Sequence, residues 1–286
     1  MRTHFSLLSA LLLAGTIPTL RAEVLYSVTA LGSLSGYDIT YGYALNNGGQ
    51  VTGASVVASG IQFHAFLYSD GQMRDLGIGD GSVGRGINNG GQVTGDFSMP
   101  SGAIHAFLYT NGQIQDLGTL GGLYSRGYGL NNQGQVAGNS YTSSNVSHAF
   151  LYTNGQMQDL GTLGGLNSFG YGINNQGQVV GNAYDPSGSS LAFVYDGGRL
   201  QNLNSLIDPI LGITLSSASA INDNGQIVAS SVSGTRTYLL TPVPEPGTWA
   251  LLGAGLLGLL GWAQGGAGPR AAWRFAQELR SSSRVR

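Results

Sequence analysis

Short runs of alternating apolar and polar residues, separated by strong turn residues, fill most of the chain. In AFLYTNGQIQDL, which begins at Ala106, two such runs flank Asn111-Gly112, a dipeptide typical of a type I′ hairpin turn. In GYGINNQGQVVGN, which begins at Gly170, two more runs flank a turn from Asn174 to Gly177. An asparagine first and a glycine fourth fit a type I turn closed by a left-handed glycine. The pattern predicts β-hairpins, and the abundance of Gly, Tyr, Phe and Val excludes helical units.

Both hairpins recur along the chain, and this internal repetition is the strongest signal in the sequence. Successive copies lie 41 to 48 residues apart, so the unit is about 43 residues long. Four short strands per unit are the content of one β-propeller blade. We interpret the repeated asparagines as turn-forming residues rather than ligand contacts. The markers are Ala65, Ala106, Ala149 and Ala192 for the first hairpin, and Asn46, Asn88, Asn131, Asn174 and Asn222 for the second turn.

The two ends of the repeat region complement each other. The first unit lacks its AFLY strand, and the last strand, in TRTYLLTP, has no unit behind it. Pairing Val28–Leu31 with Tyr238–Leu240 would complete a fifth blade and remove exposed sheet edges. We therefore expect an all-β, five-bladed β-propeller over residues 23–241. A stacked β-solenoid is the alternative, although a solenoid needs caps rather than complementary ends.

A histidine precedes the aromatic strand in three of the units, and an aspartate follows eleven residues later. Outward pairing from the Asn111-Gly112 turn places Phe107 opposite Asp116, so that His105 and Asp116 are diagonal neighbours on one face. His and Asp are replaced together in the other two copies, which suits a hydrogen-bonded pair. The three pairs are His64 with Asp75, His105 with Asp116, and His148 with Asp159; the replaced positions are Leu191 with Asn202 and Arg236 with Ala30.

The triplicated histidine favours a structural role over chemistry. A metal site needs three or more converging ligands, and one His plus one Asp per unit falls short. A Ser-His-Asp triad needs one singular serine, whereas this motif is copied three times. We therefore predict no catalytic, metal-binding or cofactor-binding residues. Leu191 and Arg236 would also interrupt any ring of histidines around a common axis.

Composition narrows the function further. The 286-residue chain has 48 glycines and no cysteine, which excludes disulfides, thiolate zinc sites and cysteine nucleophiles. Between Glu23 and Pro242 it carries twelve acidic residues and five scattered arginines, so we expect no nucleic-acid binding. Three tyrosines on variable segments could stack on sugars, but half-buried strand-end aromatics are the favoured interpretation. They are Tyr124, Tyr141 and Tyr184.

Both ends of the chain have the features of targeting segments. Arg2, the apolar run Phe5–Ala14 and a cleavage position after Ala22 predict a signal peptide over residues 1–22. At the other end, Trp249–Gly268 is a twenty-residue run without charge, long enough for a transmembrane helix. The arginines after it place the tail in the cytoplasm by the positive-inside rule.

The order of Val243, Pro244, Glu245 and Pro246, an apolar helix and arginines, over residues 242–286, resembles the PEP-CTERM sorting signal of exported bacterial proteins. The units HAFLYTNGQMQDLGTLGG and GYGINNQGQVVGN resemble the HAF-repeat extracellular family. The resemblance implies export through the inner membrane of a Gram-negative bacterium, cleavage by an exosortase, and delivery to the cell surface or a biofilm exopolysaccharide matrix. Sixteen residues follow Arg270, more than such signals usually have; without cleavage the chain would be a single-span membrane-anchored ectodomain.

These observations predict a non-enzymatic module that binds or structures extracellular polysaccharide, with any specific contacts in the variable loops. A secreted polysaccharide hydrolase or lyase is the alternative, and it would need two acids flanking the scissile bond. The unrepeated acids show no such pairing in the sequence. A third possibility is a structural matrix protein without a specific ligand. The unrepeated acids are Asp38, Asp80, Asp96 and Asp208.

Overall fold

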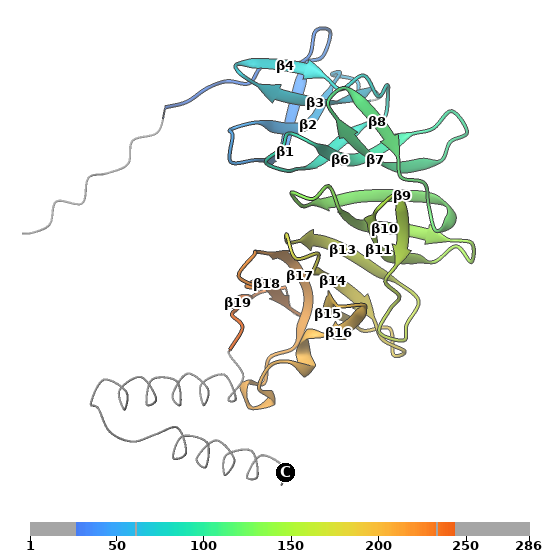
Figure 1. The fold of residues 1–286 in the computed structure, drawn as a ribbon, viewed down its shortest axis with the longest axis vertical. Helices are drawn as coiled ribbons and strands as arrows, with labels where there is room; N and C mark the ends of the chain where they lie inside the picture. Colours follow the sequence, from blue (N-terminus) through green and yellow to red (C-terminus); the bar gives the residue numbers. More distant parts are fainter. Residues whose placement is uncertain (1–26, 61, 233, 244–286) are drawn as a thin grey trace, which may run out of the picture. The chain divides into compact units, whose positions relative to one another are not determined.

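The computed structural model describes residues 27–60, 62–232 and 234–243, and these residues form an all-β protein with two short 3-10 helices (Figure 1). The chain divides into two compact units, Met1–Leu31 and Gly32–Arg286, and every strand belongs to the second. The first repeat is a four-stranded antiparallel meander in chain order. It contains β1 (Ile39–Leu45), β2 (Val51–Val56), β3 (Phe63–Ser69) and β4 (Gln72–Asp75).

The next three repeats have the same four-stranded order, and the last repeat has three strands. A single parallel pair, Ile104 with Tyr124, joins the second and third repeats into one eight-stranded sheet. The second repeat comprises β5 (Val83–Ile87), β6 (Val93–Ser98), β7 (Ile104–Thr110) and β8 (Gln113–Asp116); the third β9 (Gly121–Leu130), β10 (Val136–Thr142), β11 (Ser147–Thr153) and β12 (Gln156–Asp159). The fourth comprises β13 (Ser168–Ile173), β14 (Val179–Tyr184), β15 (Ser190–Asp196) and β16 (Arg199–Asn202); the 3-10 helices η1 (Leu203–Ser205) and η2 (Pro209–Leu211) precede the last strands, β17 (Leu215–Ile221), β18 (Ile227–Ser231) and β19 (Thr237–Leu240).

Backbone angles confirm both predicted turn types. Asn111 and Gly112 have φ angles of 50° and 86°, the left-handed pair that a type I′ hairpin requires. The turn that starts at Asn174 closes with a hydrogen bond from Gly177 N to Asn174 O, and Gly177 has a φ of 79°. The glycines at the fourth turn position all have φ angles between 72° and 79°: Gly49, Gly91, Gly134, Gly177 and Gly225.

A phenylalanine from the third strand of each four-stranded repeat is fully buried over a glycine of the second strand. A Cβ atom added to Gly138 would lie 1.9 Å from the Arg126 carbonyl oxygen and 2.7 Å from the Phe150 ring. No side chain fits there, because the first strand bulges toward the second at this point. The phenylalanines are Phe66, Phe107, Phe150 and Phe193, and the glycines Gly53, Gly95, Gly138 and Gly181.

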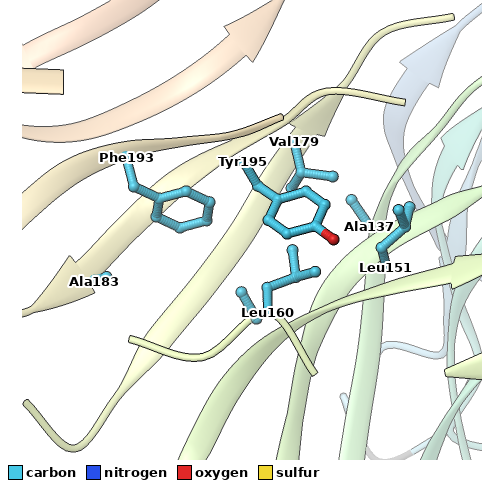
Figure 2. Packing of buried hydrophobic residues seen from close by; sticks show 8 residues of the cluster. Ala137, Leu151, Leu160, Val179, Ala183, Phe193 and Tyr195 are labelled. Atoms are coloured by element: carbon cyan, nitrogen blue, oxygen red, sulfur yellow. The ribbon is translucent and has the colours of Figure 1, made fainter. Parts of the chain in front are cut away.

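The hydrophobic core lies between neighbouring repeats rather than inside any one of them. Figure 2 shows Leu151 and Leu160 of the third repeat packed with Val179, Phe193 and Tyr195 of the fourth. A single meander cannot bury its apolar face alone, so each repeat depends on the next one for its core. Equivalent clusters join the second repeat to the first and third, and the fourth to the fifth.

The expected pairing of Val28–Leu31 with Tyr238–Leu240 is wrong in this structure. Residues 27–31 form no strand and Val28 is 95% exposed, while β19 pairs only with β18 among the described strands. The chain is fixed only after this segment, where Leu34 N donates a 3.2 Å hydrogen bond to Ser55 Oγ and Tyr37 N donates one to Leu34 O. This turn leads into β1 without adding a strand, and the last sheet keeps three.

Several predictions fall on residues outside the described ranges. These are the signal peptide over 1–22, the motif residues Pro244, Glu245 and Pro246, the apolar run Trp249–Gly268 and the arginine tail. No helix among residues 27–60, 62–232 and 234–243 is long and apolar enough to span a membrane.

Candidate binding surface on the first strands

The repeated asparagines connect the repeats as well as forming turns. Asn131 Oδ1 accepts hydrogen bonds from Gln133 N and Gln135 N, which fixes its own turn. Its Nδ2 donates to Asn174 O in the next repeat at 3.0 Å. The same link runs through all five turns and ends at Asn222: from Asn46 to Asn88, Asn88 to Asn131, Asn131 to Asn174, and Asn174 to Asn222.

The second residue of each turn forms a parallel series of links. Asn132 N donates to Asn175 Oδ1 at 2.9 Å, and Asn175 N donates to Asp223 Oδ1 at 2.8 Å. The turns of all five repeats line one pocket of about 280 Å³. The ends of the five first strands therefore converge on one place in the fold. The turn residues that line the pocket are Asn46, Asn47, Asn88, Asn89, Asn131, Asn132, Asn174, Asn175, Asn222 and Asp223.

The position three residues before the repeated asparagine holds tyrosine on three first strands, Arg85 on the second and Ser219 on the last. The guanidinium carbon of Arg85 lies 5.5 Å from the centroid of the Tyr128 ring, a cation–π distance. The Tyr128 and Tyr171 rings pack edge-on with centroids 5.8 Å apart. Tyr43, on β1, is 54% exposed. We call Tyr43, Arg85, Tyr128 and Tyr171, which come from four repeats, the first-strand cluster.

A buried carboxylate anchors this cluster. The Asp96 side chain on β6 is 7% exposed and accepts a hydrogen bond from Arg85 Nε. Arg126 Nε, from β9 of the next repeat, lies 3.7 Å from the other Asp96 oxygen, and the Arg126 side chain is 38% exposed. Burial lowers the pKa of Arg85, but the hydrogen bond and charge of Asp96 raise it by more. Two guanidinium groups thus share one carboxylate, which leaves one net positive charge beside Tyr128.

Tyr171 is a half-buried tyrosine of the cluster. Burial raises the pKa of its hydroxyl, and the neighbouring Tyr128 and Tyr184 hydroxyls add to the rise. The phenol therefore stays protonated at neutral pH and can donate a hydrogen bond. The cluster combines aromatic faces, phenol hydroxyls and a planar cation, which are groups that stack on and hydrogen-bond to sugar rings.

All three histidine–aspartate pairs come together in the structure. His64 Nδ1 lies 2.6 Å from Asp75 Oδ2, and the register pairs Phe107 with Asp116, as the hairpin geometry predicts. The histidine side chains are 19–20% exposed and the aspartates 39–41% exposed, so these pairs lie near the surface rather than in the interior. The other two pairs are His105 with Asp116 at 2.9 Å and His148 with Asp159 at 2.8 Å, both from Nδ1 to Oδ2.

The aspartate of each pair also caps the turn that follows it. Asp116 Oδ1 accepts a 2.8 Å hydrogen bond from Gly118 N. In the fourth repeat Asn202 Oδ1 accepts in the same way from Asn204 N, although the histidine position holds Leu191. An amide keeps the capping function without the imidazole, which explains how the fourth repeat tolerates both replacements.

His64 differs from the other two histidines because it contacts a second carboxylate. Its Nε2 lies 2.8 Å from Asp80 Oδ1, and the Tyr37 ring lies 5.1 Å away. Burial lowers the pKa of His64, but the hydrogen bonds and charges of Asp75 and Asp80 outweigh it and raise the pKa above 6.5. Within the described ranges no group of three or more His, Cys, Asp and Glu side chains is arranged to hold a metal ion.

The first-strand cluster was missed by sequence reasoning, which placed function in the loops and treated the arginines as scattered. Arg85 and Arg126 lie in different repeats, and only the fold brings both to Asp96. The available signal was a tyrosine that recurs at a fixed distance before a constant asparagine and is replaced by Arg85 in the second repeat. Tyr124 on β9 and Tyr141 on β10 lie in strands and pack against each other, with ring centroids 5.5 Å apart.

The comparisons with known proteins identify the C-terminal segment. Residues 242–263 match the model of the PEP-CTERM protein-sorting motif. This chain carries a PEP-CTERM sorting signal. The signal marks an exported protein that an exosortase sorts to the surface of a Gram-negative cell. It covers only the end of the chain, and no curated protein matches the sequence.

Several solved structures resemble this chain at a distance. TolB from Acinetobacter baumannii matches with a TM-score of 0.47 and 15% identity, covering 72% of this chain and 55% of TolB. A Mycobacterium tuberculosis puromycin-hydrolyzing peptidase matches at 0.42 and 14%, covering 68% of this chain and 33% of the peptidase. The BP39L lectin from Burkholderia pseudomallei matches at 0.35 and 13%, covering 68% and 66%. The chain thus spans about half of TolB and a third of the peptidase, and none of these likenesses carries an argument about function.

Proposed function

We propose that this exported protein is a non-enzymatic binding module, a five-bladed β-propeller that holds extracellular polysaccharide on its first-strand cluster. The observation that carries the proposal is the convergence of Tyr43, Arg85, Tyr128 and Tyr171 from four repeats onto one partly exposed surface. Exposed aromatic faces next to a guanidinium provide stacking and hydrogen bonding for sugar rings.

The convergence of the repeats supports a propeller over a solenoid. In a solenoid each repeat contacts only its neighbours, and no pocket can be lined by every unit. Here one pocket takes residues from all five turns, from Asn46 in the first to Asn222 in the fifth. A common axis through that pocket fits five blades whose first strands face inward. The histidine–aspartate pairs, near the surface of three repeats, then fix the geometry of individual blades.

The chemistry of the cluster favours binding over hydrolysis. A glycosidase needs two carboxyl groups on opposite sides of the scissile bond. Asp96 is the acid that contacts the cluster, and both of its oxygens face arginines. Its side chain is 7% exposed, which leaves little access for a sugar oxygen. A stable stacking surface without a free acid suits retention of a polymer in the matrix.

The sorting signal supports the same destination. In this proposal the exosortase cleaves at Pro244-Glu245-Pro246 and removes the apolar segment and the arginine tail. The released repeat domain then remains at the surface or in the exopolysaccharide matrix of a biofilm. In this proposal the exosortase acts on the chain once, during processing, whereas the polysaccharide is the binding partner of the mature protein.

A glycan array tests the proposal when it is combined with an activity screen. The protein purified from the surface fraction of the producing cells is applied to neutral and acidic glycans, and the same glycans are incubated with it and checked for new reducing ends or unsaturated products. We expect retention of at least one polysaccharide class and no cleavage. Cleavage at a rate above the protein-free control would favour the hydrolase or lyase, and absence of any retained glycan would overturn the binding function.

A further inference from the structure

We infer that the first-strand cluster selects acidic polysaccharide, and that the guanidinium of Arg126 binds the carboxylate of a uronic acid residue. The inference rests on the proposed function and adds the chemical class of the ligand. It follows from two observations. Two arginines face the single carboxylate of Asp96, and one of these arginines, Arg126, is partly exposed.

Charge is the first observation. Arg85 and Arg126 both face Asp96, and no second carboxylate approaches either guanidinium among the described residues. One positive charge therefore stays uncompensated at this position, although the chain as a whole has a formal net charge of −2. Neighbouring tyrosines neutralise none of it, because a phenol stays protonated at neutral pH.

The unequal engagement of the two arginines is the second observation. Arg85 is fixed by its hydrogen bond to Asp96 and by the Tyr128 ring. Arg126 approaches Asp96 only through Nε at 3.7 Å, which is beyond a hydrogen bond, and its side chain is 38% exposed. A guanidinium has five N–H donors in a planar fork that matches a carboxylate in two-point geometry. The Arg126 fork is thus available to an external carboxylate.

The surroundings of Arg126 favour a sugar acid over a free anion. Tyr128 contacts the Arg85 guanidinium, and Arg85 shares Asp96 with Arg126. Tyr128 and Arg126 therefore both lie beside the pair of Arg85 and Asp96. Tyr128 contacts Arg85 on one side and Tyr171 on the other. An ion such as sulfate would use only the charge, whereas a uronate uses the charge for its carboxylate and the tyrosine faces for its ring. The arrangement therefore fits a sugar ring that carries its own negative charge.

The experiment compares two ligands that differ in whether the carboxylate is free or methyl-esterified. Oligogalacturonate and its fully methyl-esterified form are titrated calorimetrically into the protein purified from the surface fraction. We expect the free acid to bind more tightly than the ester, by about tenfold, as for the loss of one charge-assisted hydrogen-bonded contact. Its affinity should fall as NaCl rises from 50 to 300 mM, while that of the ester should not.

Variants locate the site. Arg126→Gln should lower the affinity for the free acid to that of the ester, whereas the matched control Arg199→Gln, at the β16 hairpin end, should leave both unchanged. Because Arg126→Gln also removes a partner of Asp96, thermal unfolding is measured beside it. If that variant does not fold, Arg126→Lys is tested in its place, because it keeps the positive charge but lacks the planar guanidinium. We expect this variant to bind the free acid with several-fold lower affinity than the wild type.

Each outcome counts for or against the inference. Equal binding of acid and ester, or unchanged binding by Arg126→Lys and Arg126→Gln, would overturn it and leave the proposed function intact. Retention of neutral glycans alone would also overturn the inference and leave the proposed function intact. Failure to retain any glycan would overturn the proposed function and this inference together.

Discussion

Asn131 Nδ2 donates a 3.0 Å hydrogen bond to the carbonyl oxygen of Asn174, a residue 43 positions later in the chain. The bond is buried and joins two repeats at the same point of their turns. Asn222 occupies the equivalent turn in the last repeat, where its Nδ2 donates only to Gln226 within the described part of the chain. The repeated asparagine therefore has two roles, to form its own turn and to bond to the next repeat. Asn131 has both roles, whereas Asn222 has only the first among the described residues.

Asn131→Ala should reduce the free energy of unfolding more than Asn222→Ala. Both variants lose the turn bonds to Oδ1, but only the first also removes a hydrogen bond between repeats, since the Asn174 carbonyl keeps only Gly177 N as its donor. We expect a difference of about 0.5–1.5 kcal/mol, the net contribution of one hydrogen bond. Urea unfolding of both variants gives this difference directly. Equal losses would mean that the asparagines only form turns.

The pair of His105 and Asp116 should contribute little to stability, because both side chains reach solvent. A double-mutant cycle with His105→Ala and Asp116→Asn should give a coupling energy of about 0.5 kcal/mol. Asp116→Asn should be better tolerated than Asp116→Ala, since an amide can still accept from Gly118 N, as Asn202 accepts from Asn204 N.

Metal analysis of His105→Ala provides the second readout for this pair. We propose a structural role, so metal content should be the same in this variant and in the wild type. Stoichiometric zinc or calcium that is present in the wild type and lost in His105→Ala would contradict it.

His64 should make stability depend on pH in a known direction. Its pKa is raised in the folded protein above the ordinary value of 6.5, so the folded state binds the proton more tightly than the unfolded chain does. The stabilisation is therefore complete below about pH 6.5 and disappears as the pH rises through the folded pKa. The free energy that wild type gains over His64→Gln should be larger at pH 5.5 than at pH 8.5.

Asp80→Asn is the matched control for this prediction. It removes one of the two carboxylates that raise the pKa of His64, and the effect of Asp75 on that pKa remains. The pH dependence of stability should therefore become smaller without disappearing. A wild type and a His64→Gln variant that differ equally at both pH values would show that the two carboxylates have no net effect on the imidazole.

Mass spectrometry of the surface-released protein tests the sorting signal. We expect the C-terminus of the mature chain between Pro244 and Gly247, because the PEP-CTERM motif begins at residue 242 and its cleavage removes everything beyond. The sixteen residues after Arg270 provide an internal marker. Surface protein that still contains the peptide ending at Arg286 would contradict exosortase processing.

The turns and strand registers could be predicted from sequence because each depends on local chemistry. Between two strand-forming runs Asn111-Gly112 forms a type I′ turn, and that turn fixes the pairing of Phe107 with Asp116. The closing strand at Val28–Leu31 was predicted wrongly, because complementary ends show that pairing would be favourable but not that the two segments meet. Pairing between distant segments depends on the whole fold.

The first-strand cluster could not be predicted for the same reason. Arg85, Asp96 and Arg126 stand in different strands of two repeats, and the contact between them exists only once the repeats pack side by side. The recurrence of tyrosine at the strand position of Tyr128, as Tyr43 and Tyr171, was visible in the sequence, but its significance depends on the convergence of the five first strands. That convergence is a property of the packed molecule.

The most direct test of the central claim compares two tyrosine variants in one binding assay. Dissociation constants are measured for exopolysaccharide purified from the producing cells, with Tyr128→Leu in the first-strand cluster and Tyr124→Leu in the separate pair with Tyr141. Loss of one stacking face should weaken binding by Tyr128→Leu about tenfold, while Tyr124→Leu should bind like the wild type. Unchanged binding by Tyr128→Leu together with a loss in Tyr124→Leu would contradict the account and place the polysaccharide at the pair of Tyr124 and Tyr141.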